Sequence, residues 1–171
     1  MRVDGAEVAV DPDSHASLLE ALRHTAGLTA AKEGCAQGRC GSCSVLLDGA
    51  LVTACTVLAA DVVDSEVTTA AGFGSAAQPS DVQQALVDAG GVQCGFCTPG
   101  MVVALHDLLA RVPEPTEAQV RAGLAGNLCR CTGYGRIITA ALAVASGRAA
   151  AVAVASGRAA AVAVASGRAA P

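Results

Sequence analysis

Residues 34–43 read Gly-Cys-Ala-Gln-Gly-Arg-Cys-Gly-Ser-Cys, a loop in which glycines alternate with cysteines. A fourth cysteine follows, and the whole set has the spacing C-x4-C-x2-C-x11-C. The start of this spacing is typical of plant-type [2Fe–2S] sites. Glycines such as Gly38 and Gly41 let the backbone wrap around a cluster and point N–H groups at its sulfurs. We therefore predict one [2Fe–2S] cluster, held by Cys35, Cys40, Cys43 and Cys55.

Zinc is the alternative metal for this first set, because zinc also takes four thiolates. Zinc sites favour paired C-x2-C motifs, and the gap of four residues between Cys35 and Cys40 fits them poorly. Cys55 is expected to close the site from a rigid strand of the hairpin that follows the loop. The spacing thus favours an iron–sulfur cluster over zinc or free thiols.

A second set of cysteines pairs a C-x2-C motif with a C-x-C motif, through Cys94, Cys97, Cys129 and Cys131. By spacing alone this set suits zinc as well as a [2Fe–2S] cluster. Thr98 and Pro99 have the sequence of a helix N-cap and first helical position, and the dipole of such a helix favours an anionic cluster. Tyr134 is expected to pack over the C-x-C loop. Two clusters in one short chain indicate a carrier of single electrons between two other redox centres.

Composition narrows the class of protein. The chain has 171 residues and a formal net charge of −4, with nothing like a basic patch for nucleic acid. It contains no apolar run of about 18 residues, the length needed to span a membrane. The start, Met1 to Gly5, lacks the apolar stretch of a signal peptide. We expect a cytoplasmic protein, in which cysteines serve metal binding rather than disulfides.

Residues 1–71 are predicted to form a small sheet with one helix. Asp4-Gly5 and Asp48-Gly49 are hairpin turn signals between short apolar runs. Leu18, Leu19 and Leu22 form one face of a helix at about 15–25, and residues 67–69 are expected to close the sheet. This mixture indicates a ferredoxin-like β-grasp domain.

Residues 72–79 are rich in glycine and small polar residues and are interpreted as a linker. The helical domain that follows is predicted at 80–148, with four short helices beginning at Ser80, Thr98, Thr116 and about Tyr134. Each cysteine pair falls in a connection between two helices, so a bundle that joins these connections would close one four-thiolate site. Residues 149–171 repeat a ten-residue Ala-rich unit and are interpreted as a low-complexity tail without chemistry.

Three segments together resemble a known family. They are GCAQGRCGSCSVLLDG from residue 34, QCGFCTPGM from residue 93 and GNLCRCTGY from residue 126. In this order they are similar to the small iron–sulfur subunit of the molybdenum hydroxylases, a family that includes xanthine dehydrogenases, aldehyde oxidoreductases and aerobic carbon monoxide dehydrogenases. The resemblance covers about residues 2–145. It implies an α+β chain in which a β-grasp domain and a four-helix bundle each hold one [2Fe–2S] cluster.

The resemblance also implies a function and partners. A large subunit would carry molybdopterin, as the cytosine dinucleotide. It would hydroxylate a small substrate, which is carbon monoxide, an aldehyde, a purine or an N-heteroaromatic compound, with oxygen from water. Electrons would pass one at a time through the second cysteine set and then the first to FAD in a medium subunit. Gln93 and Cys131 match the family positions that approach the pterin. The implied assembly is a dimer of heterotrimers.

Two other functions fit the cysteines. A stand-alone double-cluster ferredoxin would serve several reductases and would be expected to have a strongly acidic docking face. A zinc-binding or redox regulatory protein would show no brown iron–sulfur absorbance. No Ser–His–Asp set, phosphate-binding loop or paired carboxylates indicate a substrate site on this chain.

Overall fold

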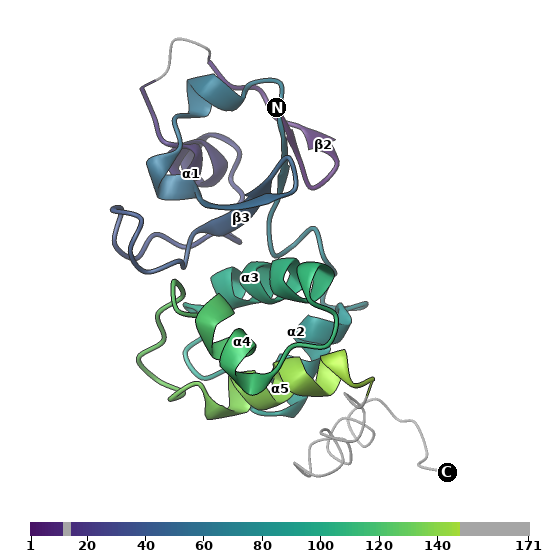
Figure 1. The fold of residues 1–171 in the computed structure, drawn as a ribbon. Helices are drawn as coiled ribbons and strands as arrows, with labels where there is room; N and C mark the ends of the chain where they lie inside the picture. The colour runs from purple at the N-terminus through teal and green to yellow at the C-terminus, as the bar shows by residue number, and fades with distance from the viewer. Residues whose placement is uncertain (12–14, 148–171) are drawn as a thin grey trace.

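The computed structural model describes residues 1–11 and 15–147 of the chain. Figure 1 shows a sheet-containing domain above a helical domain, which confirms a two-domain α+β fold. Within the described residues, no helix is both long and apolar enough to cross a membrane. The repeat predicted as a tail at 149–171 lies outside the described residues.

The first domain is built on a five-stranded sheet in the order β2-β1-β5-β3-β4. Its strands are β1 (Arg2–Val3), β2 (Ala6–Glu7), β3 (Ser44–Leu47), β4 (Ala50–Thr53) and β5 (Glu66–Thr68). β1 runs parallel to β5, and the other pairs are antiparallel. The parallel pair joins the first strand of the domain to its last strand. The first cysteine loop lies between these two strands in the sequence, so both strands that flank it belong to one sheet.

Both predicted hairpins are confirmed. Asp4-Gly5 and Asp48-Gly49 connect β1 to β2 and β3 to β4, and all four residues have positive φ. Two consecutive positive φ angles are the requirement of a type I′ turn, which Asp-Gly meets at low cost. Asp4 also accepts hydrogen bonds from the Thr69 N–H at 2.7 Å and from its hydroxyl at 2.6 Å, which ties the first turn to the end of β5.

One local prediction holds with a change of helix type, and another was wrong. The helix expected at about 15–25 forms over residues 18–25, as α1 (Leu18–Glu20) followed by a π-helical segment, η1 (Ala21–Thr25). Leu18, Leu19 and Leu22, the predicted apolar face, are buried in the core of the first domain. Cys55 comes from a short 3₁₀ helix, η2 (Ala54–Thr56), and not from a strand, because β4 ends at Thr53.

The second domain contains α2 (Asp81–Asp88), α3 (Thr98–Arg111), α4 (Glu117–Gly123) and α5 (Gly135–Ala145). Helices start at Ser80 and Thr116 as the sequence predicts, and a capping box forms at each of these starts, of α2 and α4. The predicted N-cap at Thr98 was wrong: Cys97 is the N-cap of α3, with helical backbone angles, so Thr98 and Pro99 are the first two residues of the helix.

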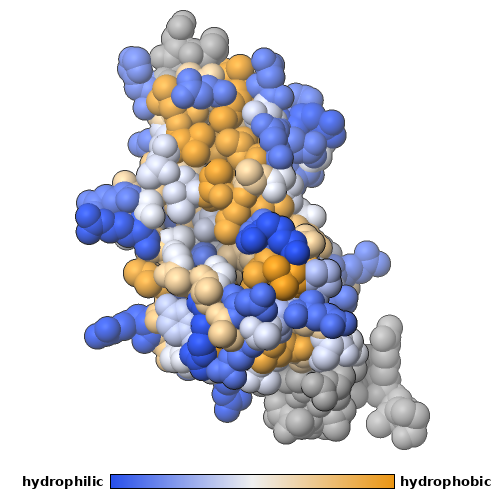
Figure 2. Space-filling view, in the orientation of Figure 1, coloured by the Kyte–Doolittle hydropathy of each residue, from blue (hydrophilic) through white to orange (hydrophobic). Residues whose placement is uncertain are grey.

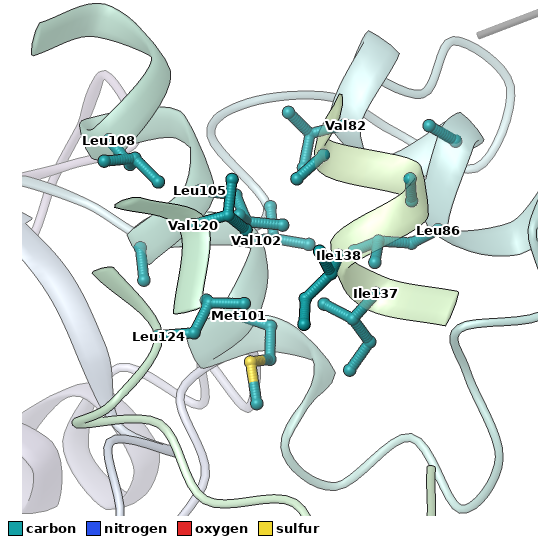
Figure 3. Packing of buried hydrophobic residues seen from close by; sticks show 14 of the residues in the cluster. Val82, Leu86, Met101, Val102, Leu105, Leu108, Val120, Leu124, Ile137 and Ile138 are labelled. Carbon is teal, nitrogen blue, oxygen red and sulfur yellow. The ribbon is translucent and has the colours of Figure 1, made fainter. Parts of the chain in front are cut away.

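The helical core is filled by aliphatic side chains from all four helices, including Leu86, Met101, Val120 and Ile137 (Figure 3). A separate cluster fills the first domain. Helix α3 lies between the two, because it packs in the helical core and also contacts β3 of the sheet (Figure 1). Leu46 of β3 packs against the helical core. The domains are thus joined by side-chain packing as well as by the linker.

The linker of residues 72–79 is anchored on the helical domain. The Phe73 ring stacks on His106 of α3 with a centroid distance of 3.9 Å. His106 Nε2 also hydrogen bonds with Ser80 Oγ at 2.9 Å, and Gln83 Nε2 donates to the Ala70 carbonyl. Three contacts therefore fix the path of the chain from β5 to α2.

Candidate metal centres

The first cysteine loop supplies backbone donors to its own sulfurs. The N–H groups of Gln37 and Arg39 donate to Cys35 Sγ at 3.4 and 3.3 Å. Gly38 N–H donates to Cys55 Sγ at 3.2 Å, and Gly38 has a φ of +71° that places this N–H inward. Backbone donors from Gln37, Arg39 and Cys40 lower the pKa of Cys35 to about 6. A loop of this kind stabilises negative charge on sulfur, as an iron–sulfur cluster requires.

Cys43 is the buried member of the first set, with 2% of its surface exposed. Burial raises the pKa of the Cys43 thiol to about 11, and the neighbouring Cys55 and Cys40 thiols add to this rise. Cys40 and Cys55 thus neighbour Cys43, and Cys40 also neighbours Cys35, so the four side chains of the set face a common space. A metal that binds Cys43 must therefore displace a tightly held proton.

The second set brings together the two motifs that are separated in sequence. Cys94 Sγ and Cys131 Sγ lie 3.5 Å apart. Burial raises the pKa of Cys97 to about 12, with the adjacent Cys129 thiol as the next cause. Burial also acts on Cys129, but hydrogen bonds from the hydroxyl and the N–H of Thr132 dominate and lower its pKa to about 7. The thiols thus form two pairs, 94 with 131 and 97 with 129.

Paired thiols are the ligand pattern of a two-iron cluster, in which each iron takes two protein sulfurs. Two sulfurs on one tetrahedral metal with bonds of ~2.3 Å lie about 3.8 Å apart, close to the spacing of Cys94 and Cys131. All eight cysteines are free thiols. Across residues 1–11 and 15–147, no three His, Cys, Asp or Glu side chains form a single-ion site. The thiol pairs of the second set and the backbone donors to sulfur in the first set thus fit a [2Fe–2S] group at each.

The two cysteine loops meet along a hydrogen-bonded seam between the domains. The Leu128 N–H donates to the Cys40 carbonyl at 2.8 Å. The buried Asn127 donates through Nδ2 to the Gly41 carbonyl at 3.0 Å and to Ser44 Oγ at 3.2 Å. We call these contacts, between residues 40–44 and residues 127–128, the intercluster seam.

The seam depends on glycines for its close approach. A Cβ on Gly100 would lie 2.0 Å from the Gly41 carbonyl oxygen, and a Cβ on Gly41 would lie 2.4 Å from the Gly126 carbonyl oxygen. Gly41 also has a φ of +67°, a conformation that other residues rarely adopt. Cluster-loop flexibility was the predicted role of Gly41, and contact with the helical domain is a second role that the sequence does not reveal.

The residues predicted to approach a pterin are accessible. Gln93 and Cys131 are exposed, as is Cys94, the thiol next to Cys131. Beside them Phe96 and Leu128 are exposed apolar side chains. The loops of both cysteine sets line one pocket of about 220 Å³. Figure 2 shows that apolar residues gather on the face of the first domain and continue towards the second.

Two family models match the chain. A 2Fe-2S iron-sulfur cluster binding domain matches residues 1–71, and a [2Fe-2S] binding domain matches residues 69–142. The nicotinate dehydrogenase small FeS subunit of Eubacterium barkeri is 41% identical, over 80% of this chain and 87% of that protein. The xanthine dehydrogenase iron-sulfur-binding subunit of Escherichia coli O157:H7 is 46% identical, over 73% and 79%.

This chain belongs to the small iron–sulfur subunits of the molybdenum hydroxylases. The structure of quinoline 2-oxidoreductase from Pseudomonas putida 86 agrees, with a TM-score of 0.79 and 38% identity over 92% of this chain and 93% of that one. The family predicted from three sequence segments is confirmed. So is the assignment of the small subunit to an oxidoreductase with [2Fe–2S] domains.

Sequence reasoning missed how some residues of the small subunit act. Asn127 and Gly100 were given no role from the sequence, although Asn127 lies two residues before Cys129 and Gly100 lies three residues after Cys97. Tyr134 was expected to pack over the C-x-C loop, and its hydroxyl in fact accepts from Cys129 N–H at 2.8 Å and donates to the Asn127 carbonyl at 3.1 Å. Adjacency to a cysteine motif was the available signal in each case.

Proposed function

We propose that the small subunit relays single electrons from a molybdopterin centre to FAD, through the second cysteine set and then the first. The clusters, when bound, supply one-electron redox steps at sulfur-ligated iron. The protein supplies fixed positions for them, and the observation that carries the proposal is the hydrogen bond from Leu128 N–H to the Cys40 carbonyl. It connects the residue before Cys129 to a residue of the other set.

The proposed ligands are the two predicted sets. Cys94, Cys97, Cys129 and Cys131 would hold the cluster proximal to molybdenum, and Cys35, Cys40, Cys43 and Cys55 would hold the distal one. The thiol pairs of the second set and the backbone donors of the first support this assignment. The domain limits that accompany it are 1–71, 72–79, 80–148 and 149–171, with a β-grasp unit and a four-helix bundle as the two folds.

The proposed partners are a large molybdenum-binding subunit and a medium FAD-binding subunit, in a dimer of heterotrimers. The substrate site would lie in the large subunit. Relatives are named for nicotinate, xanthine, aldehydes and quinoline, which supports a small N-heteroaromatic compound or an aldehyde as the substrate class. Exposed Phe96 and Leu128, next to the second cysteine set, offer apolar area for the large subunit.

Affinity purification from the native host tests this proposal, with molybdenum, iron and flavin measured in the eluate. We expect two larger chains to elute with molybdenum and flavin. Iron alone without stable partners would favour the stand-alone ferredoxin instead. Zinc without absorbance in the visible range would refute both redox functions.

Gln93→Ala tests the proposed pterin contact in the same complex. We expect unchanged iron content and slower electron entry into the second cluster. The matched control is Gln37→Ala, an exposed glutamine in the first cysteine loop. Unchanged molybdenum content and electron-transfer rates in Gln93→Ala would argue against the contact.

A further inference from the structure

Asn127 is placed to link the two cysteine sets directly. It is 4% exposed and lies two residues before Cys129. Its Nδ2 donates to the Gly41 carbonyl, one residue after Cys40, and to Ser44 Oγ, one residue after Cys43. A single carboxamide thus bonds next to two ligands of the other domain.

The main chain of Asn127 is held just as firmly. Its N–H donates to the Leu124 carbonyl at 2.9 Å, and its own carbonyl accepts from the Tyr134 hydroxyl. That hydroxyl accepts in turn from the Cys129 N–H. The hydrogen bonds therefore run from the loop of the first set, through Asn127 and Tyr134, to a ligand of the second.

A purely structural role does not account for this arrangement. The Gly41 carbonyl already accepts from the N–H of Ser44 at 3.1 Å and from its hydroxyl at 2.8 Å, so Asn127 is not needed to satisfy it. An apolar side chain could fill the same space without a buried carboxamide to desolvate. The amide adds directional hydrogen bonds, and each of them forms only when the two loops have one fixed position relative to each other.

We propose that Asn127 is a positioning residue that fixes the separation and orientation of the two clusters, and that it thereby sets the rate of electron transfer between them. The proposal rests on the relay function above. Tyr134 supports the same geometry from the side of the second set. Asn127 contacts no substrate and is not a catalytic residue.

Asn127→Ala in the full-length, cluster-loaded chain tests the proposal. We expect the iron content of two [2Fe–2S] clusters, because no ligand is removed. The magnetic interaction between the two reduced clusters, measured by electron paramagnetic resonance, should become weaker. The intercluster electron-transfer rate, measured after flash reduction, should fall several-fold.

Two further variants keep the test decisive if Asn127→Ala fails to fold. Ser44→Ala removes one acceptor of Asn127 and should change the magnetic interaction in the same direction by less. Thr139→Val is the matched control, because it removes a hydroxyl that donates to a carbonyl within α5, away from the seam. An unchanged magnetic interaction and rate in Asn127→Ala, or in Ser44→Ala if Asn127→Ala does not fold, would overturn the proposal. A wild-type chain without two clusters would refute the relay function itself.

Discussion

The two cysteine sets differ in what surrounds their sulfurs. In the first set, backbone N–H groups of a glycine-rich loop point at Cys35 and Cys55. In the second, side chains also take part: Thr132 bonds Cys129 Sγ through its hydroxyl as well as its N–H, and the Tyr134 hydroxyl holds the Cys129 N–H. Each set also has one buried thiol whose pKa is raised, Cys43 or Cys97.

This difference follows from how each site is assembled. Most of the first set lies on one continuous loop, which can fold its own N–H groups inward. The second set joins two connections 37 residues apart at Cys94 and Cys131, and the Thr132 and Tyr134 side chains fix the fold of the connection that carries Cys129 and Cys131. We therefore expect the first site to depend on backbone conformation and the second on specific side-chain contacts.

Removal of one ligand from each set gives the largest expected effect. Cys55→Ser should lose the first cluster and keep the second, and Cys129→Ser should do the reverse, because the sets share no thiol. Each variant serves as the control for the other. Iron content and paramagnetic resonance spectra check the result, and loss of both signals from either variant would show that the sites do not form independently.

Gly100→Ala should produce the next largest effect. Its Cβ would lie 2.0 Å from the Gly41 carbonyl, in a backbone contact that cannot move without opening the seam. We expect a loss of about 1–3 kcal/mol in the free energy of unfolding, the usual cost of overpacking. Denaturant titration of the cluster-loaded protein measures it.

Gly135→Ala is the matched control for Gly100→Ala. Gly135 begins α5, and a Cβ there meets nothing within 4 Å. Alanine in this helical position should leave stability unchanged or raise it slightly. Equal stability of the two variants would mean that the seam relaxes around a methyl group.

Gly38→Ala and Gly133→Ala compare the two cysteine loops directly. Both glycines have positive φ, +71° and +66°, so alanine costs about 1–2 kcal/mol at each from backbone strain. At Gly38 the Cβ would also lie 2.9 Å from the Thr56 methyl carbon, whereas Gly133 has open space. We expect Gly38→Ala to lose its cluster faster when a chelator is added, with visible absorbance as the readout. A larger effect at Gly133 would contradict the view that the first site relies more on its backbone.

Local signals explain what the sequence predicted well. The Asp-Gly turns and the helix starts at Ser80 and Thr116 depend on signals within a few residues, and each formed as expected. The cysteine spacings and three motifs were specific enough to identify the family. Prediction failed where several local conformations compete. The N-cap of α3 is Cys97 and not Thr98, and Cys55 lies in the 3₁₀ helix η2 and not at the end of a strand.

The intercluster seam was invisible in the sequence for a different reason. Asn127 and Gly41 are 86 residues apart, and no periodicity records which surfaces of two domains will meet. Gly100 has no positive φ, so only its neighbour across the seam explains why a side chain is excluded. The contacts between the sites therefore required the structure.

The smallest expected effect concerns His106 of α3, which anchors the linker. Burial lowers the pKa of His106, while the charge of Asp81 opposes that shift. The folded state then binds a proton less readily than the unfolded state, whose histidine titrates near pH ~6.5. Stability from this group is complete above that pH and is lost as the pH falls towards the lower folded pKa.

His106→Gln removes this titration and leaves a polar side chain near Ser80. We expect the difference in unfolding free energy between wild type and variant to favour wild type more at roughly pH 7.5 than at roughly pH 5.5. Denaturant titrations at the two pH values measure the difference. The spectra of both clusters should stay unchanged, because His106 stacks on Phe73 of the linker and bonds Ser80 rather than a residue of the seam. If the pH dependence of the two proteins were identical, protonation of His106 would not be coupled to folding, and the linker would be held by stacking and packing alone.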